Sequence, residues 1–476
     1  MLLADAKPVH ARWSEVNREF LEFVERNPAC LDRASFASIY ADPSMQYFPI
    51  QPWPLFVGAE QRREMEAVAL GMDRLVKDVL ERFLENDPKR LVEFYGTKGT
   101  MDGAPSLVLE LSEDMLALIL EEPNGVRSAP SRADYIETRD GLQCIEYNAG
   151  ACLGGMQNDA IAELYLEAAP TARFLREGGR RARGSGLLRA FFRHLVEDTA
   201  DLGVWRGGDF NVAVAVRPHA PGRIAMHSAE IYTRELCRVL DERAGAPRGR
   251  VLLCALDELV QERGGAVSLG GHPVHAVVEQ DNGEGDIRPV FRAFKMGGVN
   301  LFSGPISHVL RDKRNLVLLS EHAGSDEFTA AERSLIERHL PWTRRLLPGR
   351  TTRRGRAVRL PEALLEGREA FVLKKASSVG GTFVEIGRLR SDAEWKEAIR
   401  RALWEEDWVV QEYLETVPYV FQSGETGAAR HELVWGLFAF GDHFGGAWLR
   451  MQAQGGHGVV NARRGAETGA LLEVVE

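Results

Sequence analysis

The spacing of apolar residues changes along the chain and divides it into regions. From Trp13 to Val24, and again over residues 65–84, apolar side chains recur every three or four positions with charges between them. That spacing puts the apolar side chains on one face of a helix. The pattern therefore predicts an N-terminal helical region over residues 1–104, to which we assign no chemistry.

Two short runs typical of β-strands follow, at residues 133–138 and 142–148, and they flank a turn that ends in Gly141. They predict an antiparallel hairpin. If the loop has three residues with Gly141 left-handed, Asp134 lies opposite Glu146. A two-residue Asp-Gly turn would place these two carboxylates on opposite faces, because side chains alternate along a strand.

With the three-residue loop, one face of the hairpin carries two carboxylates, an amide and a guanidinium, from Asp134, Glu146, Asn148 and Arg132. Hard oxygen ligands of this kind suit Mg²⁺, which substrate phosphates often complete, and an arginine beside them complements an anion. An exposed hairpin with solvated acids is the alternative. The small, uncharged run over residues 149–155 argues against it, since polar groups in an apolar setting usually have a reason.

Strands and helices alternate between residues 206 and 285. Strand-like runs occupy residues 211–216, 251–253 and 275–278, and residues 229–240 have helical spacing. This order predicts a small open α/β domain. No G-x-G-x-x-G follows the first strand, so no dinucleotide site is expected there.

A glycine loop between two strands lies nearer the C-terminus. Residues 371–386 predict a strand, a loop with Gly380 and Gly381, and a strand, with Lys374 in the first strand. Such a loop lets backbone N–H groups approach phosphates, and a lysine before it offsets their charge. A hairpin whose glycines have a purely steric role is the alternative. A helix and an apolar strand over residues 408–414 follow.

Composition narrows the class of protein. The 476 residues are 45% hydrophobic and 27% charged, which suits a globular chain of roughly three domains. The 59 basic and 69 acidic residues give a net charge of −10, so neither nucleic acid nor an anionic membrane is an expected partner. No apolar run is long enough to cross a membrane, and the N-terminus lacks the core of a signal peptide. Five cysteines without a Cys-x-x-Cys pair indicate free thiols in a reducing cytoplasm.

One segment is similar to a known family. The pattern Arg-x-Asp, Ile-Glu-x-Asn and Gly-Gly within residues 132–155 resembles the metal-binding segment of the circularly permuted ATP-grasp ligases, which include eukaryotic-type glutathione synthetase and glutathionylspermidine synthetase. The resemblance implies a mixed α+β and α/β ATP-grasp fold with an N-terminal helical region and a small inserted α/β domain. It also implies that Asp134, Glu146 and Asn148 hold Mg²⁺ and ATP, with Arg132 near the transferred phosphate.

The same resemblance extends over residues 285–476 and implies further contacts. Residues 291–315 are similar to the segment that supplies the first ATP-contacting lysine, which would be Lys295. Lys374 would be the second lysine, and Arg450 would lie beside the acyl phosphate and the substrate carboxylate. The remaining ATP contacts would come from the flap and from the hinge against adenine, at Gly380, Gly381, Gln411, Glu412, Tyr413 and Leu414.

The chain departs from the family at the flap. Glutathione synthetase-like members have an acidic metal ligand between the flap lysine and the glycines, whereas Lys-Ala-Ser-Ser-Val follows Lys374 here. Either Asp134 completes the metal set, as in the glutathionylspermidine branch, or metal binding is altered. Between Lys374 and Lys375, we choose Lys374 as the ATP contact.

Four regions are therefore expected: N-terminal helices over residues 1–104, the metal-binding hairpin with its helices over 105–205, a substrate domain over 206–285 and a nucleotide-binding half over 286–476. The expected activity is that of an ADP-forming carbon–nitrogen ligase, which joins a carboxylate to an amine through an acyl phosphate made from ATP. A non-catalytic ATP-binding protein and an ATP-grasp phosphotransferase are the alternatives. The histidines lack the spacing of a metal-dependent hydrolase.

Overall fold

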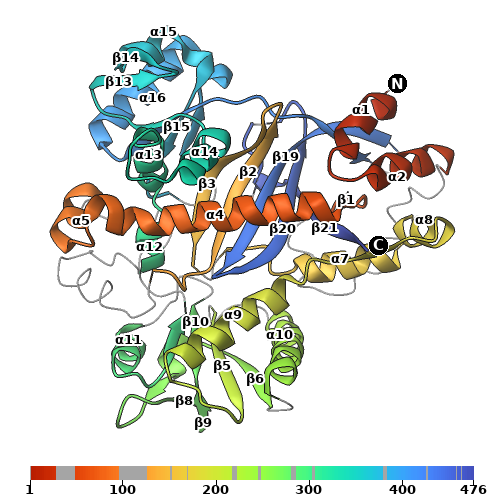
Figure 1. Ribbon diagram of the computed structural model, residues 1–476, viewed down its shortest axis with the longest axis vertical. Helices are drawn as coiled ribbons and strands as arrows, with labels where there is room; N and C mark the ends of the chain where they lie inside the picture. Colours follow the sequence, from red (N-terminus) through yellow and green to blue (C-terminus); the bar gives the residue numbers. More distant parts are fainter. Residues whose placement is uncertain are drawn as a thin grey trace.

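The computed structural model describes residues 2–27, 49–95, 126–150, 153–168, 170–216, 222–244, 248–279, 286–302, 306–378, 383–424, 427–456, 458–461 and 464–475. Three units follow one another along its longest axis: a small antiparallel unit, a central sheet and a parallel α/β unit (Figure 1). Within the described residues, no helix is both long and apolar enough to span a bilayer.

A mixed sheet forms the centre of the fold. Among the described residues it has eight strands, in the order β1-β21-β20-β19-β2-β3, with β18 beside β19 and β4 beside β21. Neighbouring strands run antiparallel except β1 and β21. The strands are β1 (Leu55–Val57), β2 (Ser131–Thr138), β3 (Gly141–Ala149), β4 (Arg181–Arg183), β18 (Tyr419–Ser423), β19 (Gly427–Phe440), β20 (His443–Ala453) and β21 (Glu467–Val475).

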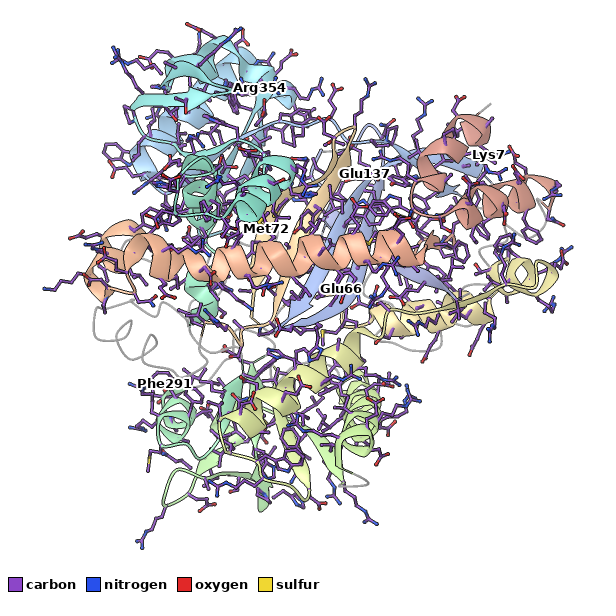
Figure 2. All side chains as sticks on the ribbon, in the orientation of Figure 1. Lys7, Glu66, Met72, Glu137, Phe291 and Arg354 are labelled. Atoms are coloured by element: carbon purple, nitrogen blue, oxygen red, sulfur yellow. The ribbon has the colours of Figure 1, made fainter. Side chains whose placement is uncertain are left out.

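One long helix, α4 (Ala59–Leu84), crosses a face of this sheet (Figure 1). Its apolar stripe, which includes Met72, is buried, as the helical spacing predicts (Figure 2). The hydroxyl of Tyr147 on β3 donates to Asp73 of α4 at 2.7 Å. Because side chains alternate along a strand, the neighbouring positions Asp134 and Glu146 lie on the other face of the sheet.

Shorter helices surround the sheet. Trp13 stands between α1 (Leu2–Ala11) and α2 (Glu15–Arg26), and its Nε1 donates to Oε2 of Glu137 on β2 at 2.9 Å. This contact connects the N-terminal helices to the central hairpin. The other helices near the sheet are α5 (Pro88–Tyr95), α7 (Asn158–Glu167), α8 (Thr171–Glu177) and α12 (Ile306–Leu310).

The α/β unit contains a parallel sheet in the order β11-β10-β5-β6. Its strands are β5 (Phe210–Ala215), β6 (Gly249–Cys254), β10 (Ala276–Glu279) and β11 (Asn300–Phe302), and its helices are α9 (Leu187–Asp201), α10 (Gly222–Ala244) and α11 (Arg288–Lys295). A 3₁₀ turn (Leu256–Glu258) and a three-stranded sheet of β7 (Val260–Gln261), β8 (Val267–Leu269) and β9 (His272–Val274) are attached. The parallel sheet thus continues past residue 285, where the alternating pattern ends.

The small unit has an antiparallel sheet in the order β12-β17-β15-β16. Its strands are β12 (Thr343–Arg345), β15 (Phe371–Lys375), β16 (Val384–Ile386) and β17 (Trp408–Glu412), beside a separate hairpin of β13 (Gly349–Arg353) and β14 (Arg356–Leu360). The helices are α13 (Arg314–Glu321), α14 (Ala330–His339), α15 (Glu362–Glu366) and α16 (Asp392–Glu405), with 3₁₀ turns at Arg368–Ala370 and Gly387–Leu389. A separate apolar core around Trp395 and Trp408 supports this sheet.

The predicted hairpin is confirmed as β2 and β3, but the three-residue loop is wrong. Thr138 pairs with Gly141, which leaves a two-residue turn. In a regular ladder that turn would put Asp134 and Glu146 on opposite faces. The register instead shifts by one residue, so that Ile145 is the extra residue of a β-bulge and Asp134 pairs with Glu146. The two carboxylates share a face for a different reason from the one predicted.

Candidate functional site

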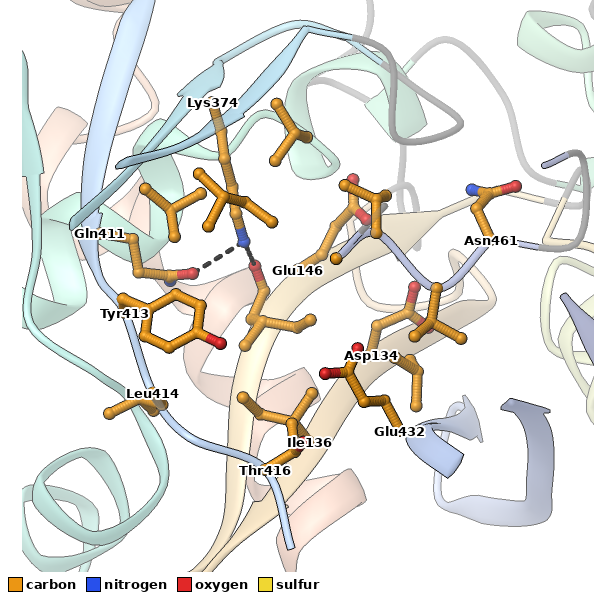
Figure 3. A pocket seen from close by; sticks show the side chains of 18 of the residues that line it. Asp134, Ile136, Glu146, Lys374, Gln411, Tyr413, Leu414, Thr416, Glu432 and Asn461 are labelled. Atoms are coloured by element: carbon orange, nitrogen blue, oxygen red, sulfur yellow. Dashed lines mark hydrogen bonds between the residues drawn. The ribbon is translucent and has the colours of Figure 1, made fainter. Parts of the chain in front are cut away.

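A pocket lies between the small unit and the central sheet (Figure 3). It opens to solvent, and the empty space within it and its open mouth together amounts to about 1000 Å³. Its floor comes from β2, β3, β19 and β20, its roof from β15, β16 and β17, and one side from the residues that follow β20. Acidic and basic side chains both line it, those of Asp134, Glu146, Glu412, Glu432, Lys313, Lys374 and Arg450.

The bulge in β3 brings floor and roof together. The carbonyl oxygen of Ile145 accepts a hydrogen bond from Nζ of Lys374 at 2.8 Å, and the same ammonium donates to Oε1 of Gln411 at 2.8 Å (Figure 3). The extra residue of a bulge stands outside the regular ladder, so its carbonyl is available for this contact. The bulge therefore sets where Lys374 lies relative to the floor.

Lys374 is largely buried, with 9% of its surface exposed. Burial lowers the pKa of its ammonium to about 8, although the negative charge of Glu146 opposes that shift. Burial disfavours the charged form of a lysine, and an approaching anion favours it. An ammonium at this place is a compact charge that suits a phosphate oxygen.

A second lysine reaches the pocket from the start of α13. Nζ of Lys313 lies 3.1 Å from Oε1 of Glu146 and donates to the carbonyl oxygen of Ser378 at 2.6 Å. Ser378 comes directly before residues 379–382, which contain the predicted glycine flap. Lys313 thus connects an acid of the floor with the base of that flap. Gly380 and Gly381 themselves lie outside the described residues.

Lys295, which the family resemblance selected as the first ATP lysine, is elsewhere. It ends α11 in the α/β unit and does not belong to the described lining of the pocket. Figure 2 labels Phe291 of the same helix in the lower unit and Arg354 of the small unit near the top, with the central sheet between them. Lys313, by contrast, lines the pocket. Both lysines lie in one basic stretch of the sequence, so their spacing alone does not distinguish them.

Asp134 contacts both arginines of the predicted site. Its Oδ1 lies 2.8 Å from Nε of Arg132 and 2.5 Å from a terminal nitrogen of Arg450. Its Oδ2 accepts from Arg132 at 3.2 Å and from Nδ2 of Asn148 at 3.4 Å. Burial acts to raise the pKa of this carboxyl, but the two guanidinium groups hold it below its ordinary value. Arg132 and Asn148 are thus connected to the pocket by their hydrogen bonds to Asp134, which lines it.

The wall beside β17 is apolar and contains the predicted hinge. Gln411, Glu412, Tyr413 and Leu414 all line the pocket, close to Ile136, Val372, Ile386 and Val434. The backbone N–H groups of Glu412 and Tyr413 are already bonded, to the carbonyls of Trp342 and Ala370 at 2.8 Å each. Arg353 and Arg354 hold the carboxylate of Glu412 at 2.6 and 2.9 Å. The apolar side chains of this wall suit a flat apolar ligand.

Two lining residues carried no role in the sequence analysis. Glu432 lies on β19, and burial raises the pKa of its carboxyl while Arg388 opposes that shift. Asn461 lies across the pocket from Tyr413, in the segment after β20 (Figure 3). Gly458 and Asn461 line the pocket together.

The donor set fits a hard cation at two of the three expected positions. The described residues contain no group of three or more Asp, Glu, His or Cys side chains that could hold a metal. The carboxylate of Glu146 and the amide oxygen of Asn148 are donors that suit Mg²⁺ completed by phosphates. Both oxygens of Asp134 already accept N–H groups. Glu146 and Asn148 therefore fit the ion.

Comparison with known proteins identifies the fold. No protein-family model and no curated protein matches the chain. Its structure is similar to that of a glutathione synthetase-like effector from Globodera pallida in its apo form, with a TM-score of 0.52 and 12% identity over 89% of this chain and 90% of that one. A proposed γ-glutamylcysteine synthetase from Methylobacillus flagellatus KT has a TM-score of 0.36 and 11% identity, over 85% of this chain and 88% of that one. The chain has a glutathione synthetase-like mixed α/β fold.

Proposed function

We propose that the protein is an ATP-dependent carboxylate–amine ligase of the circularly permuted ATP-grasp type. One observation carries the proposal: Lys313, Lys374 and Arg450 converge on a pocket between an antiparallel roof and a floor that bears Glu146. Cations from several elements suit the phosphates of a nucleotide, and the apolar wall beside Leu414 suits a purine. The fold-level likeness to a glutathione synthetase-like protein supports the ligase class.

The groups in the pocket match the needs of phosphoryl transfer, which depends on position and charge and requires no side-chain nucleophile. A carboxylate oxygen of the substrate would attack the γ-phosphorus of ATP, and ADP would leave. An amine would then attack the acyl carbon, lose a proton and expel phosphate, so that the product is an amide. Lys313 and Lys374 would offset charge on the phosphates, and Arg132 and Arg450 would stabilise the oxyanion.

Glu146 and Asn148 would hold Mg²⁺, which supplies positive charge beside the phosphates when it is bound. The carbonyls of residues 411–414 would face the edge of adenine. Cys144, Cys237 and Cys254 are free thiols among the described residues, and this supports a reducing, cytoplasmic location for the reaction.

An amine that intercepts acyl phosphates tests the proposal without knowledge of the true acceptor. Purified protein is incubated with Mg²⁺-ATP, hydroxylamine and a panel of amino acids and short peptides, and both ADP and hydroxamate are measured. A hydroxamate formed in equal amount with ADP is the expected result, and it names the acyl donor. ADP without hydroxamate for every carboxylate contradicts the ligase mechanism.

A non-catalytic ATP-binding protein is the second candidate, because no acidic residue lies between Lys374 and the flap glycines. Saturable ATP binding with no ADP under any condition of the same assay supports it. A stable phosphorylated compound would instead identify a phosphotransferase.

A further inference from the structure

The carboxylate of Asp134 is enclosed by donors. The side chain is only 3% exposed, and its two oxygens lie within 3.4 Å of nitrogen atoms from Arg132, Arg450 and Asn148. The hydrogen bonds from Arg132 and Asn148 place N–H groups where a cation ligand needs a free lone pair, and Arg450 adds an ion pair. Glu146 on the same face differs, since its side chain is 22% exposed and its Oε1 lies 3.1 Å from Nζ of Lys313.

Arg132 and Arg450 share one counter-charge, the carboxylate of Asp134. Arg132 and Arg450 are 6% and 4% exposed. Their guanidinium carbons lie 5.1 and 4.8 Å from the ring centre of the same indole, that of Trp448. Two like charges so close together and out of water repel, and the carboxylate of Asp134 lies between them.

The backbone is also shaped around Arg132. Gly436 of β19 pairs with Asp134 across the ladder. A Cβ atom at Gly436 would lie 2.7 Å from Cδ and 3.1 Å from Nε of Arg132. A glycine inside a strand often marks the close approach of another group. Here the missing side chain leaves the space in which Arg132 reaches Asp134.

We infer that Asp134 is a positioning residue that holds Arg132 and Arg450 in place, and that it is not a ligand of the metal. This inference rests on the proposed function. Nε of Arg450 is buried and has no hydrogen-bond partner among the described residues, so the arginine held by Asp134 keeps a donor for a substrate oxygen. The metal would then depend on Glu146 and Asn148.

A metal titration separates the two roles. Mn²⁺ binding is followed by electron paramagnetic resonance at saturating ADP in the wild type, in Asp134→Asn and in the matched control Glu146→Gln. We expect Glu146→Gln to weaken Mn²⁺ binding about tenfold or more, and Asp134→Asn to leave it unchanged within error while it abolishes turnover. Equal weakening in the two variants overturns the inference.

A stability measurement tests the same role without nucleotide. Asp134→Asn should lower the melting temperature, because two buried guanidinium groups lose their counter-charge. The double variant Arg132→Gln with Asp134→Asn should recover part of the loss, because it removes the surplus positive charge. An unchanged melting temperature in Asp134→Asn, or a further loss in the double variant, overturns the inference.

The two measurements also separate this inference from the proposed function. If the wild type binds neither ADP nor Mn²⁺-ADP, the nucleotide site is refuted, and the stability cycle alone decides the role of Asp134. If Asp134→Asn is recovered only unfolded, the charge-balanced double variant replaces it in the titration, with the same expected affinity for Mn²⁺.

Discussion

At the scale of single residues, Arg450 in this pocket combines burial, an ion pair and a donor that is unpaired within the described part of the chain. It is buried on the floor, contacts Asp134 and retains an Nε donor without a partner among the described residues. A buried donor left unpaired costs about 1–3 kcal/mol. A substrate oxygen that accepts a hydrogen bond from this Nε removes that cost. The hydrogen bond becomes stronger when the oxygen gains negative charge in the transition state.

Replacement of Arg450 by alanine should slow the reaction rather than weaken ATP binding. Loss of one oxyanion donor typically costs about 10²–10³-fold in kcat, and Asp134 keeps Arg132 as its partner in the variant. Hydroxamate formation and the dissociation constant of ATP are measured in parallel. Turnover close to that of the wild type would remove Arg450 from the mechanism.

From the lowered pKa of Lys374 we expect ATP binding to depend on pH. Because its pKa in the free protein is lowered to about 8, the ammonium is charged below that pH and loses its proton above it. Phosphates favour the charged form, so ATP binding takes up a proton above pH 8, and affinity falls by up to about tenfold per pH unit.

Isothermal titration between pH 6.5 and 9.5, in buffers of different ionisation enthalpy, measures this uptake directly. In Lys374→Met the affinity should be weaker throughout and should lose its slope above pH 8. A wild-type dissociation constant that stays level across this range contradicts a phosphate contact through Lys374.

At the scale of elements, the hairpin of β2 and β3 shows what a sequence can predict. Alternation identifies both strands and the residues of each face, because apolar and polar positions follow the two-residue period. Turn length is less informative, since Thr138 and Gly141 close a two-residue turn and a bulge at Ile145 restores the pairing of Asp134 with Glu146. The carbonyl of the bulge residue accepts from Lys374 of the roof, and this contact joins segments far apart in the chain, which local sequence patterns do not reveal.

The strand glycine on β19 gives a prediction at this scale. Gly436→Ala should reduce turnover strongly, because the new Cβ would lie 2.7 Å from Cδ of Arg132 and force that side chain away from Asp134. The control is Gly349→Ala on β13, where a Cβ has no neighbour within 4 Å and which does not belong to the described pocket lining. Hydroxamate formation and circular dichroism are compared. Equal activity in the two variants would show that the space at Gly436 is not needed.

At the scale of the whole molecule, the site depends on how the units come together. The stretch over residues 291–315 predicts a lysine for the phosphates, but its two halves belong to different units. Lys295 ends α11 in the α/β unit, whereas Lys313 precedes α13 and reaches Glu146 on the floor. Spacing along the chain does not reveal which lysine faces the pocket, because that is set by the packing of the small unit on the central sheet.

Ligand-induced stabilisation distinguishes the two lysines. A ligand at 100 times its dissociation constant stabilises the folded state by about 2.7 kcal/mol, so Mg²⁺-ATP should raise the melting temperature of the wild type. Lys313→Met should lose most of that rise, because it removes a charge that lies 3.1 Å from Glu146 at the base of the flap. Lys295→Met should keep the full rise, since Lys295 is outside the described lining. Scanning calorimetry with Mg²⁺-ATP, and with Mg²⁺ alone as the blank, makes the comparison. The reverse pattern would place the phosphates near the α/β unit and would refute the pocket between roof and floor as the nucleotide site.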